Sequence, residues 1–216
     1  MTNRQEPFDA ILLASGGMDS TVLAYQLVAD GLQVIPTFVD YGQHCKDKEY
    51  SNLLNLLPDE LKSRIHVLDL SSVYSQSTSK LIHPANLWEE TIGANDLYIP
   101  YRNLLFLAAA SAFAQSVGVL KVYSGFIDSN HALEIDCSME FFSKVGGFLR
   151  DYGPVEVIMP FRNMQKSDVA RLGLKLGVPI AQTYSCQVNP NSHCGACPNC
   201  VDRLDALEIA MQENGK

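Results

Sequence analysis

The sequence lacks the features of several large classes of protein. None of its apolar runs approaches the roughly 20 residues that a membrane-spanning helix needs, and residues 1–7 are polar, without the apolar core of a signal peptide. Lys and Arg total 16 against 24 Asp and Glu, so the net charge is −8. The chain therefore has no basic surplus of the kind that binds nucleic acid broadly. We expect a cytoplasmic protein that binds neither a membrane nor nucleic acid.

Two common phosphate-binding signatures are also missing. No lysine follows the glycines at positions 16 and 17, as a Gly-x-x-x-x-Gly-Lys-Ser/Thr loop requires, and the same stretch does not fit Gly-x-Gly-x-x-Gly. No internal repeat is visible. The composition is otherwise ordinary, with 47% hydrophobic and 19% charged residues among 216. Residues 1–216 should therefore form a single domain with a sizeable core.

Predicted strands alternate with predicted helices along the chain. Short apolar runs indicate strands at 8–13, 32–39, 65–70, 120–125 and 155–160, and apolar residues at helical spacing indicate helices at 21–27, 46–57, 104–117, 140–150, 166–176 and 201–212. This alternation is typical of an α/β protein whose mostly parallel sheet carries helices on both faces. The polar, irregular segment 71–98 is interpreted as a lid over the site or as a disordered spacer.

A glycine-rich stretch joins the first predicted strand to the first predicted helix. Gly16 and Gly17 allow the backbone to turn tightly beside an oxyanion, while the helix directs its N–H groups and the positive end of its dipole at that anion. Asp19 would be a poor phosphate ligand, so it either caps the helix or meets a metal ion beside the phosphate. An isolated Gly-Gly turn could be purely structural. The full stretch predicts a phosphate site formed by Ala14, Ser15, Gly16, Gly17, Met18, Asp19, Ser20 and Thr21.

Polar residues also follow the second strand and precede the helix at 104–117. Gln43 belongs to the stretch 40–44, at the edge where open parallel sheets bind ligands. Arg102 and Asn103 stand at the mouth of the helix. A cation there could meet a phosphate or a carboxylate. From spacing alone, a surface ion pair explains Arg102 equally well.

Four of the six cysteines lie close together near the end of the sequence. Cys186, Cys194, Cys197 and Cys200 are separated by seven, two and two residues, which lets four thiolates surround one ion in a tetrahedron. In a reducing compartment such a cluster indicates a metal site rather than disulfides. We predict a structural Zn²⁺ that fastens residues 181–216 to the α/β core of residues 7–180. An iron–sulfur cluster is the rival interpretation.

Together these motifs resemble those of the QueC family of 7-cyano-7-deazaguanine synthases. The similarity runs from about residue 8 to residue 206 and includes 14–20, 40–43, 100–103, 124–125, 136–137, 166–168, 172–173, 183–186 and 194–197. The resemblance implies a Rossmann-like, adenine nucleotide alpha hydrolase-like fold and an ATP pyrophosphatase (PP-loop) enzyme that uses ATP, Mg²⁺ and Zn²⁺. It implies that 7-carboxy-7-deazaguanine is adenylated, that ammonia displaces AMP, and that a second adenylation of the amide leads to a nitrile.

The resemblance also implies roles for single residues. Catalysis would involve Asp19, Ser20 and Arg102. The deazaguanine substrate would meet Gln43, Arg102, Asn103, Glu134 and Asp136, the two carboxylates accepting from its N–H edge.

The chain departs from the family pattern where the acceptor would be recognised. Tyr101 stands where the family usually has glycine, Asn130 where it has aspartate, and Ser138 where it has arginine. Two functions therefore stay open. One is nitrile synthesis. The other is that of a paralogue passing an activated acid to another nucleophile, such as a protein amine in an antiviral defence system. A tRNA sulfurtransferase fits the acidic charge poorly, a non-enzymatic zinc module leaves the loop unexplained, and a homodimer is open in either case.

Overall fold

The computed structural model describes residues 8–84, 89–90, 92–127 and 135–214. Its five strands form one parallel sheet in the order β3-β2-β1-β4-β5. Each predicted strand is present, and the prediction of a parallel α/β sheet is confirmed. The strands are β1 (Ala10–Leu13), β2 (Val34–Asp40), β3 (His66–Asp69), β4 (Lys121–Tyr123) and β5 (Glu156–Ile158).

Helices alternate with these strands, and their starts follow local sequence signals. Ser138 caps α5, its hydroxyl accepting from the Phe141 amide at 3.1 Å, and Pro198 occupies the first position of α7. The predicted helices are all present, and the sequence pattern missed only short turns such as α3 (Asp59–Lys62). The longer helices are α1 (Met18–Ala29), α2 (Lys46–Leu56), α4 (Arg102–Ser116), α5 (Met139–Tyr152), α6 (Lys166–Lys175) and α7 (Pro198–Asn214).

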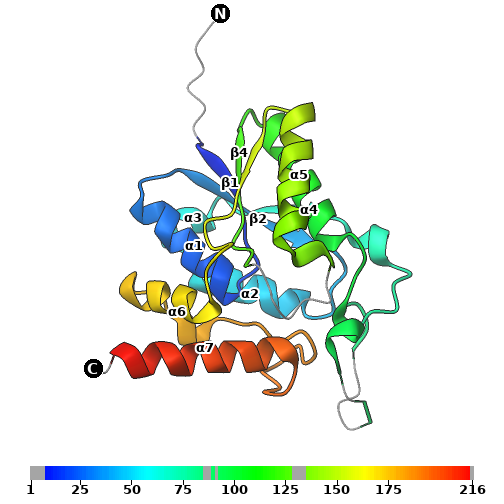
Figure 1. Ribbon diagram of the computed structural model, residues 1–216, viewed down its shortest axis with the longest axis vertical. Helices are drawn as coiled ribbons and strands as arrows, with labels where there is room; N and C mark the ends of the chain where they lie inside the picture. Colours follow the sequence, from blue (N-terminus) through cyan, green and yellow to red (C-terminus); the bar gives the residue numbers. More distant parts are fainter. Residues whose placement is uncertain (1–7, 85–88, 91, 128–134, 215–216) are drawn as a thin grey trace, which may run out of the picture.

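Alternate side chains of β1 enter two separate cores, one on each face of the sheet. Ala10 and Leu12 pack in the cluster that includes residues of α1, α6 and α7, whereas Ile11 and Leu13 pack with residues of α4 and α5. In Figure 1 the strands accordingly lie between α4 and α5 on one side and α1, α6 and α7 on the other. Because both faces are covered, the strand ends are left as the place for a ligand.

A third apolar cluster joins the segment after β3 to the cysteine-rich region. Tyr74, Leu81 and Leu97 are buried and belong to one cluster with Cys186 and Cys197. Two short 3₁₀ helices, Ser71–Tyr74 and Ala94–Leu97, lie in this segment. The interpretation of 71–98 as a disordered spacer is therefore wrong for its described residues. None of these described residues lines the cavity below, so they brace the cysteine region rather than form a lid.

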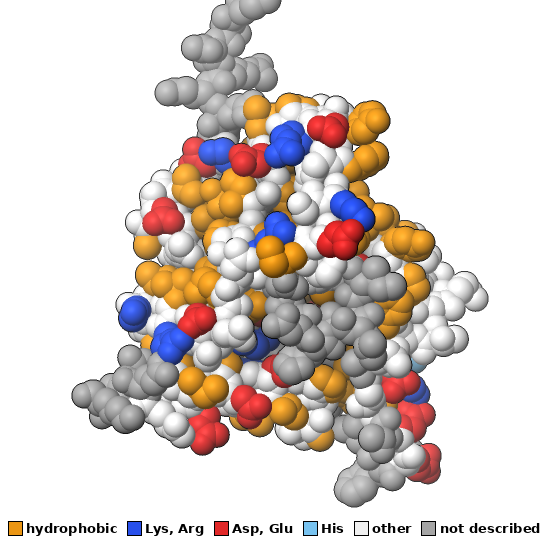
Figure 2. All heavy atoms as spheres, viewed as in Figure 1, with side chains coloured by type: hydrophobic (Ala, Val, Ile, Leu, Met, Phe, Trp, Pro, Cys, Tyr) orange, Lys and Arg blue, Asp and Glu red, His pale blue; other side chains and the backbone are white. Residues whose placement is uncertain are grey.

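The surface shows no broad basic area on the face in Figure 2, where Lys and Arg side chains lie scattered among Asp and Glu. Such a face offers no continuous track for a phosphate backbone. In the described part of the chain, no helix is both long and apolar enough to cross a bilayer.

Candidate active site

A cavity of about 840 Å³ opens at the carboxyl end of the sheet. Its walls come from the loop after β1, the ends of β2 and β4, the first turn of α4 and the starts of α6 and α7. The chain passes from β1 to β2 on one side and later returns to β4 on the other. The connections therefore diverge beside β1, which leaves a crevice at the strand ends.

Gly16 allows the loop after β1 to lie directly against α2. Its φ is +75°, and a Cβ added there would stand 2.5 Å from the Glu49 carbonyl oxygen and 2.7 Å from the Leu53 nitrogen. Both atoms are backbone, so neither can move without moving α2. Only glycine satisfies this conformation and this contact together.

The residues predicted to bind phosphate separate into two groups. Gly16 supplies the turn, Met18 belongs to the apolar core, and Thr21 is buried with its hydroxyl donating to the Gly17 carbonyl at 2.7 Å. These three do not contribute to the described lining of the cavity. The residues that do line it are Ala14, Ser15, Gly17, Asp19 and Ser20.

Lys166, at the first position of α6, supplies the cation that the loop itself lacks. Its Nζ lies 3.3 Å from Asp19 Oδ2, and both residues line the cavity. Asp19 Oδ1 is buried and has no hydrogen-bond partner among the described residues. An unpaired carboxylate oxygen is costly inside a protein unless a ligand or an ion meets it. Asp19 thus fits the metal-binding interpretation, and no side chain caps α1 at Gly17.

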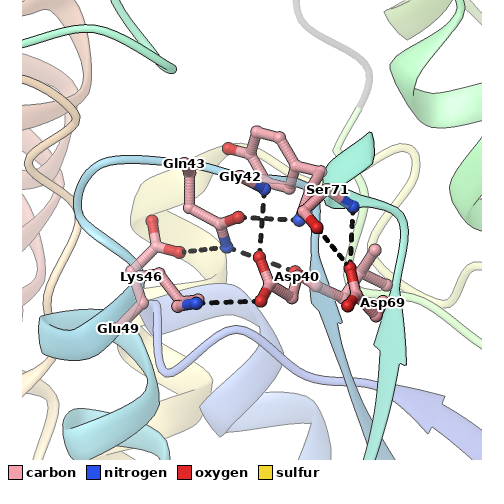
Figure 3. A network of polar contacts seen from close by, with 9 residues as sticks. Asp40, Gly42, Gln43, Lys46, Glu49, Asp69 and Ser71 are labelled. Atoms are coloured by element: carbon pink, nitrogen blue, oxygen red, sulfur yellow. Dashed lines mark hydrogen bonds and ion pairs between the residues drawn. The ribbon is translucent and has the colours of Figure 1, made fainter. Parts of the chain in front are cut away.

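Gln43 fixes the turn that follows β2 (Figure 3). Its Oε1 accepts from the Tyr41 amide at 2.9 Å, and its Nε2 donates to the Val39 carbonyl at 3.2 Å and to Glu49 Oε2 at 3.0 Å. Both amide hydrogens and the amide oxygen are therefore engaged within the protein. Gln43 lines the cavity, but its amide group is used to hold the turn at 39–43 and the Glu49 side chain in place.

Two carboxylates hold the neighbouring strand ends in Figure 3. Asp40 accepts from the Gly42 amide at 3.0 Å and from Lys46 Nζ at 3.0 Å. Asp69 accepts from the Ser71 amide at 2.9 Å and from its hydroxyl at 2.6 Å. Neither carboxylate belongs to the described lining of the cavity, so these charges stabilise the turns behind it.

Glu49 and Arg102 place opposite charges on the same wall. Burial raises the pKa of Glu49 to about 7, although the hydrogen bond from Gln43 and the positive charge of Arg102 both lower it. The Arg102 guanidinium carbon lies 5.9 Å from the centre of the Tyr41 ring, and burial raises the pKa of that phenol above its ordinary value. The wall therefore holds a carboxyl group that can exchange a proton near neutral pH beside a fixed cation.

Asn103 and Asp136 are bonded to each other at the start of α4. The Asn103 amide donates to Asp136 Oδ2 at 3.3 Å, and Asn103 Nδ2 donates to the Asp136 carbonyl and to Cys137 Sγ, each at 3.1 Å. Asn103 lines the cavity, whereas Asp136 is buried and is not among the described lining residues. A carboxylate at a helix N-terminus is favourable. The described contacts of Asp136 are those of a helix anchor, and Glu134 lies outside the described residues.

Two departures from the family pattern have local consequences. Tyr101 precedes α4 with φ +59°, the left-handed conformation in which glycine is least strained, and its side chain is exposed. Ser138 is the cap of α5, a task that arginine cannot perform. Asn130 lies outside the described residues.

The four clustered cysteines converge as their spacing predicts. Their sulfur atoms all lie within 4.8 Å of one another, and the Cys194 and Cys200 sulfurs are 3.9 Å apart. A tetrahedral zinc ion with Zn–S bonds of about 2.3 Å would place its ligands roughly 3.8 Å apart. The Asn189 amide donates to Cys186 Sγ at 3.3 Å and the Cys197 amide to Cys194 Sγ at 3.2 Å.

One of these thiols, that of Cys186, is favoured as a thiolate by its neighbours, whereas burial raises the pKa of Cys200 and the Cys186 thiolate beside it raises that of Cys197. The Cys197 thiol and backbone N–H groups donate to Cys186 and lower its pKa well below the ordinary value. At least one thiolate is therefore stabilised by the protein itself. The sulfur–sulfur separations suit a single ion rather than an iron–sulfur cluster, whose ligands stand farther apart. The four cysteines could therefore hold zinc.

Some residues around the cavity were not predicted as site residues. Lys166 belongs to the motif at 166–168, and its position after the last predicted strand is the signal that places it at the carboxyl edge of the sheet. Glu49 follows Gln43 by six positions and starts no motif of its own. Asp202 and Asp205 of α7 also line the cavity. Their places depend on how α2, α6 and α7 pack, which no local pattern reveals.

The chain is similar to known proteins over most of its length. The sequence profile described as "Queuosine biosynthesis protein QueC" matches residues 9–211. Proteins named 7-cyano-7-deazaguanine synthase from Nitratiruptor sp. and Marinobacter nauticus are 30% and 33% identical to this chain; the alignments cover 93% and 91% of it and 94% and 91% of those proteins. The one from Archaeoglobus fulgidus is 32% identical, with 92% and 85% covered.

A solved structure gives a likeness of fold alone. The 4-thiouridine synthetase bound to RNA and ATP superposes with a TM-score of 0.54 at 16% identity, covering 95% of this chain and 53% of that one.

Proposed function

Because this chain belongs to the QueC family, we propose that it is an ATP-dependent ligase that converts 7-carboxy-7-deazaguanine and ammonia into 7-cyano-7-deazaguanine. Family membership supports the type of reaction. The observation that carries it to this chain is the meeting of the Gly-rich loop, Lys166, Asp19 and Arg102 around one cavity. That cavity has room for a nucleotide and a small acid side by side.

The chain's own groups suggest how ATP would be held. The N–H groups at the start of α1 and the Lys166 ammonium would face the phosphates, which are the largest negative charges of the substrate. Asp19 Oδ1 would hold Mg²⁺, which neutralises a leaving pyrophosphate when bound. Ser15 and Ser20 would add hydroxyl donors at the same end of the cavity.

The acid would lie at the other end, near α4. Arg102 would meet its carboxylate or the α-phosphate, and Asn103, held by Asp136, would shape the adjoining wall. The carboxylate oxygen attacks the α-phosphorus and pyrophosphate leaves, ammonia then displaces AMP, and a second adenylation on the amide oxygen precedes nitrile formation. Each of the two adenylations needs an oxygen aligned with the α-phosphorus, and groups on opposite walls of the cavity would hold the two reactants in that alignment.

We also propose that residues 181–216 act with the α/β core as one domain, fastened by Zn²⁺. The Tyr184 amide donates to the Gly16 carbonyl at 3.3 Å, and Asn52 Nδ2 donates to the Gln182 carbonyl at 2.8 Å. Arg203, buried in α7, donates to the Ile180 carbonyl at 3.2 Å. The cysteine region therefore supports the back of the ATP loop.

Product analysis tests the proposed function. Protein incubated with ATP, Mg²⁺, 7-carboxy-7-deazaguanine and ammonium should release AMP and pyrophosphate and yield the nitrile, as measured by mass spectrometry. Lys166→Met should weaken ATP by about 10- to 100-fold because a charge-assisted contact is lost, whereas Lys144→Met, an exposed lysine of α5, should not. AMP release without amide or nitrile would favour transfer to another nucleophile. No acid-dependent AMP release would refute the proposal.

A further inference from the structure

Glu49 has one carboxylate oxygen engaged and one available. Oε2 accepts from Gln43 Nε2 at 3.0 Å, and no described residue hydrogen-bonds Oε1. Figure 3 shows this second oxygen pointing away from the Gln43 network. Gln43 is itself fixed by the backbone of residues 39 and 41. The hydrogen bond from Gln43 therefore fixes the Glu49 carboxyl group, and Glu49 lines the cavity.

Among the titratable groups that affect the Glu49 carboxyl, Arg102 is charged at physiological pH. Tyr41, after β2, and Cys45, at the start of α2, are buried, and burial raises the pKa of both, that of Cys45 to about 12. Both are neutral at physiological pH. Arg102 of α4 contributes the positive charge. The positive charge of Arg102 favours the ionised form of Glu49, while burial favours the protonated form. The carboxylate can therefore form and still bind a proton.

The proposed reaction requires a base at two steps, attack by ammonia and formation of the nitrile, because nitrogen loses protons in both. Near neutral pH ammonia is present mostly as ammonium, which has no lone pair with which to attack an acyl adenylate. Formation of the nitrile removes the two amide protons as well. Ammonium therefore needs a proton acceptor before it can attack, and the activated amide needs one before it can become a nitrile.

We propose that Glu49 is the general base that removes protons from nitrogen, first from ammonium and then from the activated amide. This role rests on the proposed function. In the first stage Glu49 takes a proton from ammonium, the nitrogen lone pair forms the C–N bond, and the bond from carbon to the AMP oxygen breaks. Glu49 then releases its proton to water and accepts the proton that the added nitrogen must lose to become a neutral amide.

In the second stage the amide oxygen has bonded to the α-phosphorus and pyrophosphate has left. Glu49 then accepts the N–H protons in succession, the N–H electron pairs become C–N bonds, and AMP departs with the oxygen. The pKa of about 7 suits a group that must bind and release a proton in each cycle.

Glu49→Gln tests this role, because the amide keeps the size of the side chain and can still accept from Gln43. Asp47→Asn, an exposed acid on the same helix, is the matched control. Three readouts are compared: acid-dependent ATP–pyrophosphate exchange, hydroxamate formation with hydroxylamine, and amide formation with ammonium. Hydroxylamine is largely unprotonated at pH 7 and needs little help from a base.

Exchange and hydroxamate formation by Glu49→Gln should stay within about threefold of the parent. Ammonium-dependent amide formation at pH 7 should fall about 10²- to 10⁴-fold and recover as the pH approaches 9, where free ammonia increases. Glu49→Asp should retain part of the ammonium-dependent rate, which keeps the test valid if Glu49→Gln folds poorly. Equal losses with hydroxylamine and ammonium, or a parent-like pH profile in Glu49→Gln, would overturn the role of Glu49. Absence of exchange in the parent would instead refute the proposed function.

Discussion

Gly16→Ala should be far more damaging than alanine at another left-handed glycine. Gly16 and Gly31 have nearly the same φ, +75° and +77°, but a Cβ at Gly16 meets the backbone of α2 at 2.5 Å while one at Gly31 meets nothing within 4 Å. Gly31→Ala is therefore a matched control that carries the conformational strain without the steric overlap.

The expected losses follow from these two terms. Placing a non-glycine residue in the left-handed region costs about 1–2 kcal/mol, and the smaller entropy of the unfolded alanine chain returns roughly 0.4–1 kcal/mol. Gly31→Ala should thus lose about 0.5–1 kcal/mol of unfolding free energy. The overlap at Gly16 adds roughly 1–3 kcal/mol for displaced backbone, so Gly16→Ala should lose about 1.5–4 kcal/mol of unfolding free energy.

Urea unfolding of both variants measures the difference, provided that the denaturant slope is unchanged. Gly16→Ala should also weaken ATP binding, because the loop can relieve the overlap only by moving away from α2. Gly31 lies at the far end of α1, so its variant should bind ATP like the parent. If both variants lose the same stability, the close packing of the loop on α2 is not what requires glycine at position 16.

Three further predictions concern the cysteines, the contact of Asp136 with α4 and the half-buried Glu49. Cys197→Ser should lose the bound zinc and lower the melting temperature together, by elemental analysis and calorimetry; unchanged metal content would remove Cys197 from the ligand set. Asp136→Ala should cost about 1–3 kcal/mol in urea unfolding because the buried Asn103 amide loses its acceptor, and Asp136→Asn less; equal, negligible losses would contradict the anchoring role. The pKa of Glu49 is raised from 4.5 to about 7, so ionising it opposes folding. Glu49→Gln should match the parent in unfolding free energy near pH 4.5 and increasingly exceed it up to about pH 7. A constant difference across that range would argue against the raised pKa.

The sequence alone predicted the parts of this protein that local chemistry controls. Apolar runs located the five strands of the sheet; the signal is continuous in β1 and β2, which are buried almost throughout, and weaker in β3 and β5, which are partly exposed. The glycine-rich loop was evident because its backbone conformation excludes side chains. The four cysteines were evident because a tetrahedral site restricts the spacing of its ligands, and their sulfurs do converge.

Tertiary packing decided what the sequence pattern could not. Lys166 pairs with Asp19 across 147 positions of sequence, since the sheet brings the starts of α1 and α6 to the same edge. Asp136, predicted from the sequence as a substrate-binding residue, accepts a hydrogen bond from the first turn of α4, a contact that no local pattern reveals. Glu49 carries no motif, and its altered pKa comes from burial beside Gln43 and Arg102. Local patterns specify each element, but the charges that meet in a cavity depend on which elements pack together, because electrostatic effects act over space rather than along the chain.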